Sequence, residues 1–123
     1  MVRDHRLYLD DIIEAVRRIR EFTNNMDFDG FKADIKTQDA VVRNLEIIGE
    51  AAGRLPEEVH LSAPEIEWRK IVGIRNILAH EYFGISLPII WDIVQNKLNE
   101  LSDTCLRLTS ESPDRSKSLS LIH

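Results

Sequence analysis

The sequence contains a single cysteine among its 123 residues, Cys105, so the chain cannot form an internal disulfide. A lone thiol is typical of proteins in a reducing compartment, and we expect a cytoplasmic protein. No apolar run approaches the roughly 20 residues that cross a bilayer. The first residues lead into an amphipathic pattern and not into the apolar core of a signal peptide. These absences predict neither a disulfide-stabilised secreted domain nor a membrane protein.

The chain also lacks an excess of basic residues. It has 16 lysine and arginine residues against 21 aspartate and glutamate residues, which gives a formal net charge of −5. Proteins that bind nucleic acids over a broad face are usually basic, so any contact with RNA is expected at a local basic site. The histidines are scattered along the sequence. Together with the lone cysteine, they predict no structural metal site and no cofactor.

The sequence does have apolar residues at helical spacing, and no strand pattern competes with them. We expect at most a short helical turn within 27–36 and a loop over 57–67. Short connections favour antiparallel neighbours. The predicted fold is an all-α antiparallel bundle over residues 1–108, followed by a polar C-terminal tail over 109–123. Its four main helices are predicted over about 4–23, 37–55, 68 to 80 or 82, and 86–108.

The second predicted helix has a clear start and contains two glycines. Thr37 before Gln38-Asp39 fits an N-cap followed by an acidic first turn. Pro56 ends the helix. Gly49 and Gly53 lie four residues apart on one face, and each costs about 1 kcal/mol relative to alanine. We therefore expect another helix to approach closely there, although tolerated drift on an exposed surface is the alternative.

The residues with the most chemical content end the third predicted helix, in Arg75-Asn76-Ile77-Leu78-Ala79-His80-Glu81-Tyr82. Arg75 can bind a phosphate oxygen through forked hydrogen bonds and stabilise the charge that grows at phosphorus. His80 can transfer a proton near neutral pH, and Asn76, four residues earlier, can orient its ring. RNA supplies its own nucleophile, the 2′-hydroxyl. This set therefore predicts metal-independent RNA cleavage that leaves a cyclic phosphate and a 5′-hydroxyl.

An ideal helix does not bring Arg75 and His80 together. They lie about 140° apart around the axis and about 7.5 Å apart along it. Either the helix loosens near His80, or a second copy of the chain supplies the facing half. The second option predicts a symmetric dimer with a groove along its interface, and Gly73 would leave room for the approach. A solvated arginine and a helix-end histidine placed favourably against the helix dipole are the simpler alternative.

Two further polar residues admit both a functional and a simpler interpretation. Glu50 can be a positioning partner of Arg75, or it can belong to a surface ion-pair ladder with Glu46 and Arg54. Tyr82 offers a hydroxyl at the end of the predicted site. The simpler interpretation is a helix-end tyrosine that packs its ring and exposes its hydroxyl.

The segment from Arg75 to Tyr82 resembles the RX4HXY signature of HepT-like toxins in the HEPN superfamily. Residues 46–51 on the second predicted helix and residues 68–76 leading into the motif are also similar to that family's pattern. The spacing of all four predicted helices agrees with it as well. The resemblance covers roughly residues 4–108.

This resemblance implies a homodimeric all-α ribonuclease toxin in which Arg75 and His80 are catalytic and Asn76 is the polar residue after the arginine. It also implies an antitoxin partner with a minimal, MntA-like nucleotidyltransferase fold. That partner would attach AMP to the motif tyrosine, which corresponds to Tyr82, and the added phosphates would repel or block RNA. The rival hypotheses are a non-enzymatic helical module that docks a nucleotidyltransferase, and a pure dimerising scaffold.

Overall fold

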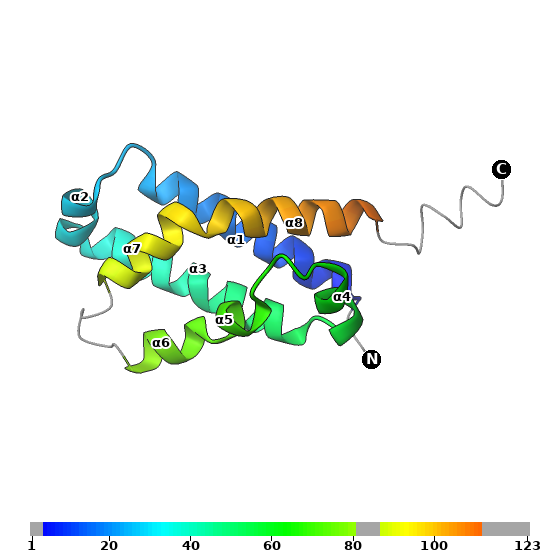
Figure 1. Cartoon of the computed structure of the whole chain (residues 1–123). Helices are drawn as coiled ribbons and strands as arrows, with labels where there is room; N and C mark the ends of the chain where they lie inside the picture. The colour runs from blue at the N-terminus through cyan, green and yellow to red at the C-terminus, as the bar shows by residue number, and fades with distance from the viewer. Residues whose placement is uncertain (1–3, 81–86, 112–123) are drawn as a thin grey trace.

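A computed structural model describes residues 4–80 and 87–111 of the chain. Every regular element in these two ranges is an α-helix, which confirms the predicted all-α class. No helix in them is both long and apolar enough to span a membrane. The helices (Figure 1) are α1 His5–Thr23, α2 Phe28–Ala33, α3 Ile35–Arg54, α4 Glu57–Ser62, α5 Trp68–Val72, α6 Ile74–His80, α7 Leu87–Asn96 and α8 Leu98–Glu111.

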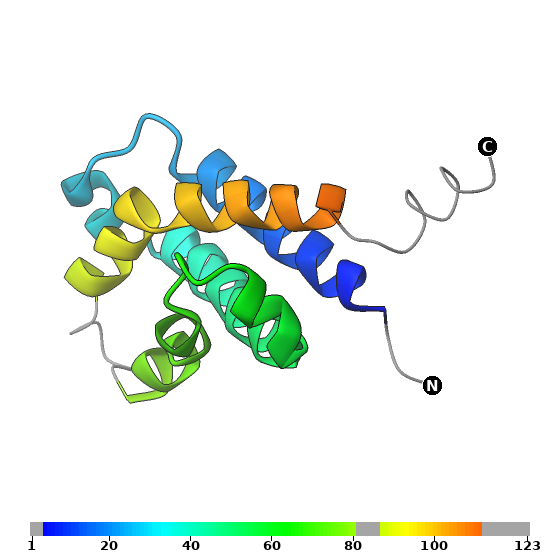
Figure 2. The ribbon, with the colours of Figure 1, turned by 45° about the vertical axis from the view of Figure 1, so that its right-hand side comes forward.

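The core lies where the three longest helices meet. Helix α1 packs against α3 and α8 and runs in the opposite direction to both (Figures 1 and 2). Cys105 of α8 is fully buried there, and desolvation raises the pKa of its thiol to about 12. Each fully buried valine, leucine or isoleucine contributes roughly 1.5–3 kcal/mol. These side chains include Leu9, Ile12, Val16, Ile19, Val41, Leu45, Ile48, Leu98 and Leu101.

Helix α3 begins earlier than predicted, and Thr37 is not its N-cap. The cap is Asp34, whose carboxylate accepts hydrogen bonds from the backbone N–H of Thr37 at 3.0 Å and from its hydroxyl at 2.9 Å. An N-cap side chain satisfies amides two or three residues further on, so Thr37 is the residue that is capped. The short turn expected within 27–36 is present as α2, which Asp27 caps in the same way.

Replacing Asp34 with alanine should lower the thermal stability at pH 7, and the difference from wild type should disappear in acid. The hydrogen bonds from Thr37 hold the pKa of the Asp34 carboxyl below its ordinary value of 3.8. Because the folded-state pKa is the lower one, the stabilisation is present above about pH 4 and is lost as the pH falls through the folded-state value. Thermal melts followed by circular dichroism between pH 7 and pH 3 would measure it. Asp34→Asn keeps a capping oxygen that does not titrate and is the matched control. A difference in melting temperature between wild type and Asp34→Ala that stays the same from pH 7 to pH 3 would contradict the assignment.

The structure differs from the predicted elements in four details. The loop expected over 57–67 contains α4, which follows Pro56 and buries Val59. The third predicted helix is interrupted at Gly73, the C-cap of α5, because glycine has a low helix propensity. The fourth is divided at Lys97 into α7 and α8. Helix α8 then continues through Glu111, whereas the fourth helix was predicted to end at about residue 108.

Side-chain contacts from α4 fix the start of α5. The ring of His60 stacks on that of Trp68 with 4.7 Å between the ring centroids, and its Nε2 lies 2.8 Å from the carbonyl oxygen of Ala52. The indole N–H of Trp68 donates to the carbonyl of Ala63 at 3.0 Å. A buried indole whose N–H is satisfied contributes a large apolar area without an unpaired donor. These contacts hold the segment that leads into α6.

Candidate functional site

Helices α5 and α6 pack against α3 at the two glycines of α3. A Cβ added to Gly49 would lie 3.1 Å from Cγ of Arg75 and 3.4 Å from the carbonyl oxygen of Ile71. A Cβ added to Gly53 would lie 3.5 Å from Cγ1 of Val72. The close approach predicted from the two glycines is therefore confirmed at Gly49, where Ile71 of α5 and Arg75 of α6 bound the space, while Gly53 would make only ordinary contact with Val72 of α5.

The aliphatic part of the Arg75 side chain, its stem, packs against the protein, while the rest of the side chain is exposed. Its Cγ and Cδ lie against Gly49 of α3, while the residue as a whole is exposed. Among the described residues, Arg75 has no ion-pair partner. Arginine commonly buries its methylene groups while its charged head stays in water. The arrangement leaves a fixed positive charge accessible to an anionic ligand such as a phosphate group.

The helix that carries Arg75 also carries Asn76 and ends at His80. Asn76 is exposed and takes part in an interaction. Helix α6 stays α-helical from Ile74 through His80, so it does not loosen between Arg75 and His80. The side chain of His80 and the whole of Tyr82 lie outside the described residues. Their catalytic and modification roles stay predictions.

Glu50, the residue after Gly49, pairs with Arg54 in the structure. The distance between Arg54 Nη2 and Glu50 Oε1 is 3.5 Å, and both side chains are largely exposed. This pair corresponds to the surface-ladder interpretation and contributes little stability. The part proposed for Glu50 in positioning Arg75 stays a prediction.

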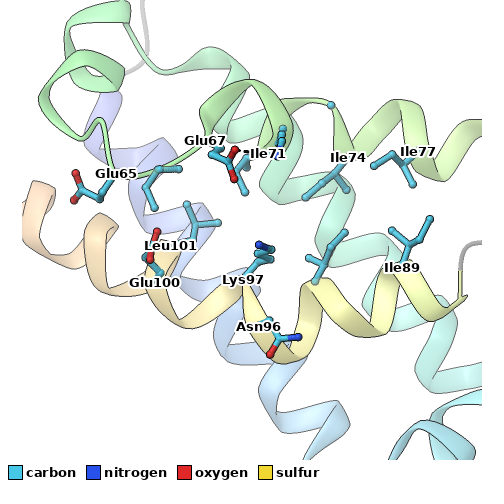
Figure 3. A pocket seen from close by; sticks show the side chains of 14 residues that line it. Glu65, Glu67, Ile71, Ile74, Ile77, Ile89, Asn96, Lys97, Glu100 and Leu101 are labelled. Carbon is cyan, nitrogen blue, oxygen red and sulfur yellow. Dashed lines mark ion pairs between the residues drawn. The ribbon is translucent and has the colours of Figure 1, made fainter.

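A cavity of about 350 Å³ lies between α5 and α6 on one side and α7 and α8 on the other (Figure 3). Ile74 and Ile77 of α6 face Ile89 of α7 across it. Ile77 lies about 200° around the helix from Arg75, so the cavity opens on the side of α6 away from the guanidinium. The amino-acid pattern does not predict this cavity, because the cavity depends on how far apart two successive pairs of helices pack.

Charged residues form the rim of this cavity. Lys70 Nζ lies 2.9 Å from Glu67 Oε2, and this hydrogen-bonded pair lowers the pKa of the Glu67 carboxyl. Glu65, together with Lys97 and Glu100 of the α7–α8 segment, completes the charged part of the lining. In residues 4–80 and 87–111, no group of three or more potential metal-binding side chains is present.

The profile of the family described as Ribonuclease HepT-like matches residues 12–108, which include α6 with Arg75, Asn76 and His80. The chain belongs to the HepT-like ribonuclease family. The resemblance carried by the segment from Arg75 to Tyr82 is thereby confirmed at the level of the family.

Individual HepT-like relatives agree with this membership. A candidate RNase of Methanocaldococcus jannaschii is 49% identical over 96 residues, which are 78% of this chain and 79% of the relative. A probable ribonuclease HepT of Thermococcus cleftensis is 44% identical over 101 residues, 82% of this chain and 92% of the relative. A candidate RNase of Caldanaerobacter subterraneus is 38% identical over 96 residues, 78% and 86% of the two chains. No solved structure matches the chain significantly.

Proposed function

We propose that this HepT-like protein is a metal-independent endoribonuclease and the toxin of a toxin–antitoxin pair. The observation that carries the proposal is the Arg75 side chain, held by its stem against α3 and free of ion pairs among the described residues. It lies five residues before His80 on one uninterrupted helix. The family match and the names of the relatives, which describe ribonucleases, support RNA as the substrate.

In the proposed reaction, the 2′-hydroxyl of the substrate attacks the adjacent phosphorus and the bond to the 5′-oxygen breaks. His80 takes the proton from the 2′-hydroxyl or returns one to the leaving 5′-oxygen. Arg75 binds the non-bridging oxygens and stabilises their growing charge, and Asn76 orients the imidazole. The products are a 2′,3′-cyclic phosphate and a 5′-hydroxyl. Because α6 separates Arg75 from His80 around its axis, the complete site combines Arg75 of one chain with His80 of a second.

Product analysis tests the reaction directly. The wild-type protein, incubated with RNA in the presence of EDTA, should cut it and leave fragments with a 2′,3′-cyclic phosphate at one end and a 5′-hydroxyl at the other. Mass spectrometry of the fragments identifies both ends. A DNA strand of the same sequence is the control, since it lacks the 2′-hydroxyl and should stay intact. Absence of RNA cleavage at every protein concentration would favour the non-enzymatic module that docks a nucleotidyltransferase.

We also propose that an MntA-like nucleotidyltransferase antitoxin inactivates the protein by transferring AMP from ATP to the hydroxyl of Tyr82, with pyrophosphate as the leaving group. The phosphate of each AMP unit would repel RNA near Arg75 and His80. The chain has two tyrosines, Tyr8 and Tyr82, so two single substitutions are enough to test the site. After incubation with the partner and ATP, the intact mass should rise by AMP units in wild type and Tyr8→Phe but not in Tyr82→Phe. Additions that persist in Tyr82→Phe would reject the site.

A further inference from the structure

We propose that Gly49 is a positioning residue for Arg75. Its missing side chain lets α3 hold the arginine stem at the place where the guanidinium meets the phosphate. This inference rests on the proposed function, in which Arg75 binds the reacting phosphodiester. Gly49 itself touches no substrate and acts through Arg75.

The contact at Gly49 has no room for a methyl group. Gly49 is buried, and an added Cβ would lie 3.1 Å from Cγ and 3.6 Å from Cδ of Arg75. The carbonyl oxygen of Ile71, 3.4 Å away, bounds the same space from α5. A contact of 3.1 Å is shorter than the 3.5–4.0 Å optimum between carbon atoms. An alanine here would therefore displace the arginine stem, or α6 with it.

The stem contact matters because little else in the structure fixes Arg75. The side chain is exposed and has no ion-pair partner among the described residues. A long side chain without such a contact samples many rotamers, and ordering it on substrate binding costs side-chain entropy. Packing the stem against the α3 backbone removes part of this freedom in advance. Glycine is the residue that allows the backbone to come so close.

Gly53 offers a matched control one turn further along α3. A Cβ there would lie 3.5 Å and 3.8 Å from the two γ-carbons of Val72, which are ordinary contact distances. Gly49→Ala and Gly53→Ala add the same methyl group to the same helix, with the same gain in helix propensity. Only the first displaces Arg75. Differences between the two variants therefore report on the arginine and not on the helix.

We expect Gly49→Ala to lower kcat/KM for RNA cleavage by about tenfold, since a misplacement of 1 Å can cost about 10²-fold and the shift here is smaller. Gly53→Ala should cleave as wild type does. The shape of the pH–rate profile should stay the same in both variants because neither substitution adds or removes a titratable group. Equal activity of the two alanine variants, or an altered pH profile in Gly49→Ala, would overturn the positioning role.

A double-mutant cycle on thermal stability tests the contact without any activity measurement. Arg75→Ala removes both Cγ and Cδ, so Gly49→Ala should raise the melting temperature more in the Arg75→Ala background than in wild type. Additive changes would show that the two residues do not interact and would overturn the inference. A wild-type protein that cleaves no RNA would instead overturn the proposed function. Coupling in the cycle would then leave Gly49 as a packing residue, so the two failures are distinguishable.

Discussion

Replacing His80 with alanine should lower the rate of RNA cleavage by about 10²–10⁴-fold, the usual contribution of a general acid or base. Arg75→Ala should cause a loss of about 10²–10³-fold, comparable to removing one donor that stabilises transition-state charge. Arg75→Lys should recover only part of this loss, because an ammonium group cannot form the forked hydrogen bonds of a guanidinium. Both losses should appear mainly in kcat.

The measurement is single-turnover cleavage of a fluorescent RNA, with growth inhibition on expression in cells as a second readout. Arg18→Ala is a suitable control, since Arg18 is an exposed arginine of α1 that pairs with Glu14. It changes the net charge by the same amount as Arg75→Ala, so a general electrostatic effect on RNA binding would appear in both. Equal activity of wild type, Arg75→Ala and His80→Ala would contradict the catalytic assignment. Circular dichroism of each variant separates a lost site from a lost fold.

The all-α class of the fold can be predicted from the sequence because apolar residues at helical spacing are its strongest signal. Ile12, Val16 and Ile19 recur at helical spacing and the structure buries all three, whereas Leu7 and Phe22, which were predicted on the same apolar stripe, are exposed. The interruptions at Gly73 and Lys97 were not predicted. At both places the apolar pattern continues across the break, so periodicity alone describes one helix where the structure has two. The N-cap of α3 was misplaced for a related reason: Asp34 and Thr37 are both good capping residues, and only the backbone decides between them.

The candidate site, too, could be predicted only in part from the sequence. Gly49 and Gly53 predicted a close helix approach because two glycines in one helix are costly without such a purpose, and the structure places α5 and α6 against them. The sequence did not reveal that the approaching side chain at Gly49 is Arg75. Nor did it reveal the cavity beside Ile74 and Ile77. Both depend on how α6 is rotated about its axis, which is set by packing against several other helices.

Mixing the two inactive variants should restore RNA cleavage if the site is shared between two chains. On α6, Arg75 and His80 stay about 140° apart around an uninterrupted helix, so a single chain presents them to different directions. In a symmetric dimer, each of the two sites would combine Arg75 of one chain with His80 of the other. A mixed dimer of Arg75→Ala and His80→Ala chains then contains one site with both substitutions and one site with neither.

Random pairing of equal amounts gives about half mixed dimers, each with one of its two sites intact, so about a quarter of the wild-type activity should return. The two variants would be unfolded together and refolded, or co-expressed with different tags and purified through both. Each variant refolded alone should stay inactive. If Arg75 and His80 instead act within one chain, every chain of the mixture lacks one of them and no activity returns. Recovery therefore requires both a dimer and a site that crosses its interface, because a dimer with two self-contained sites would give the same result as a monomer.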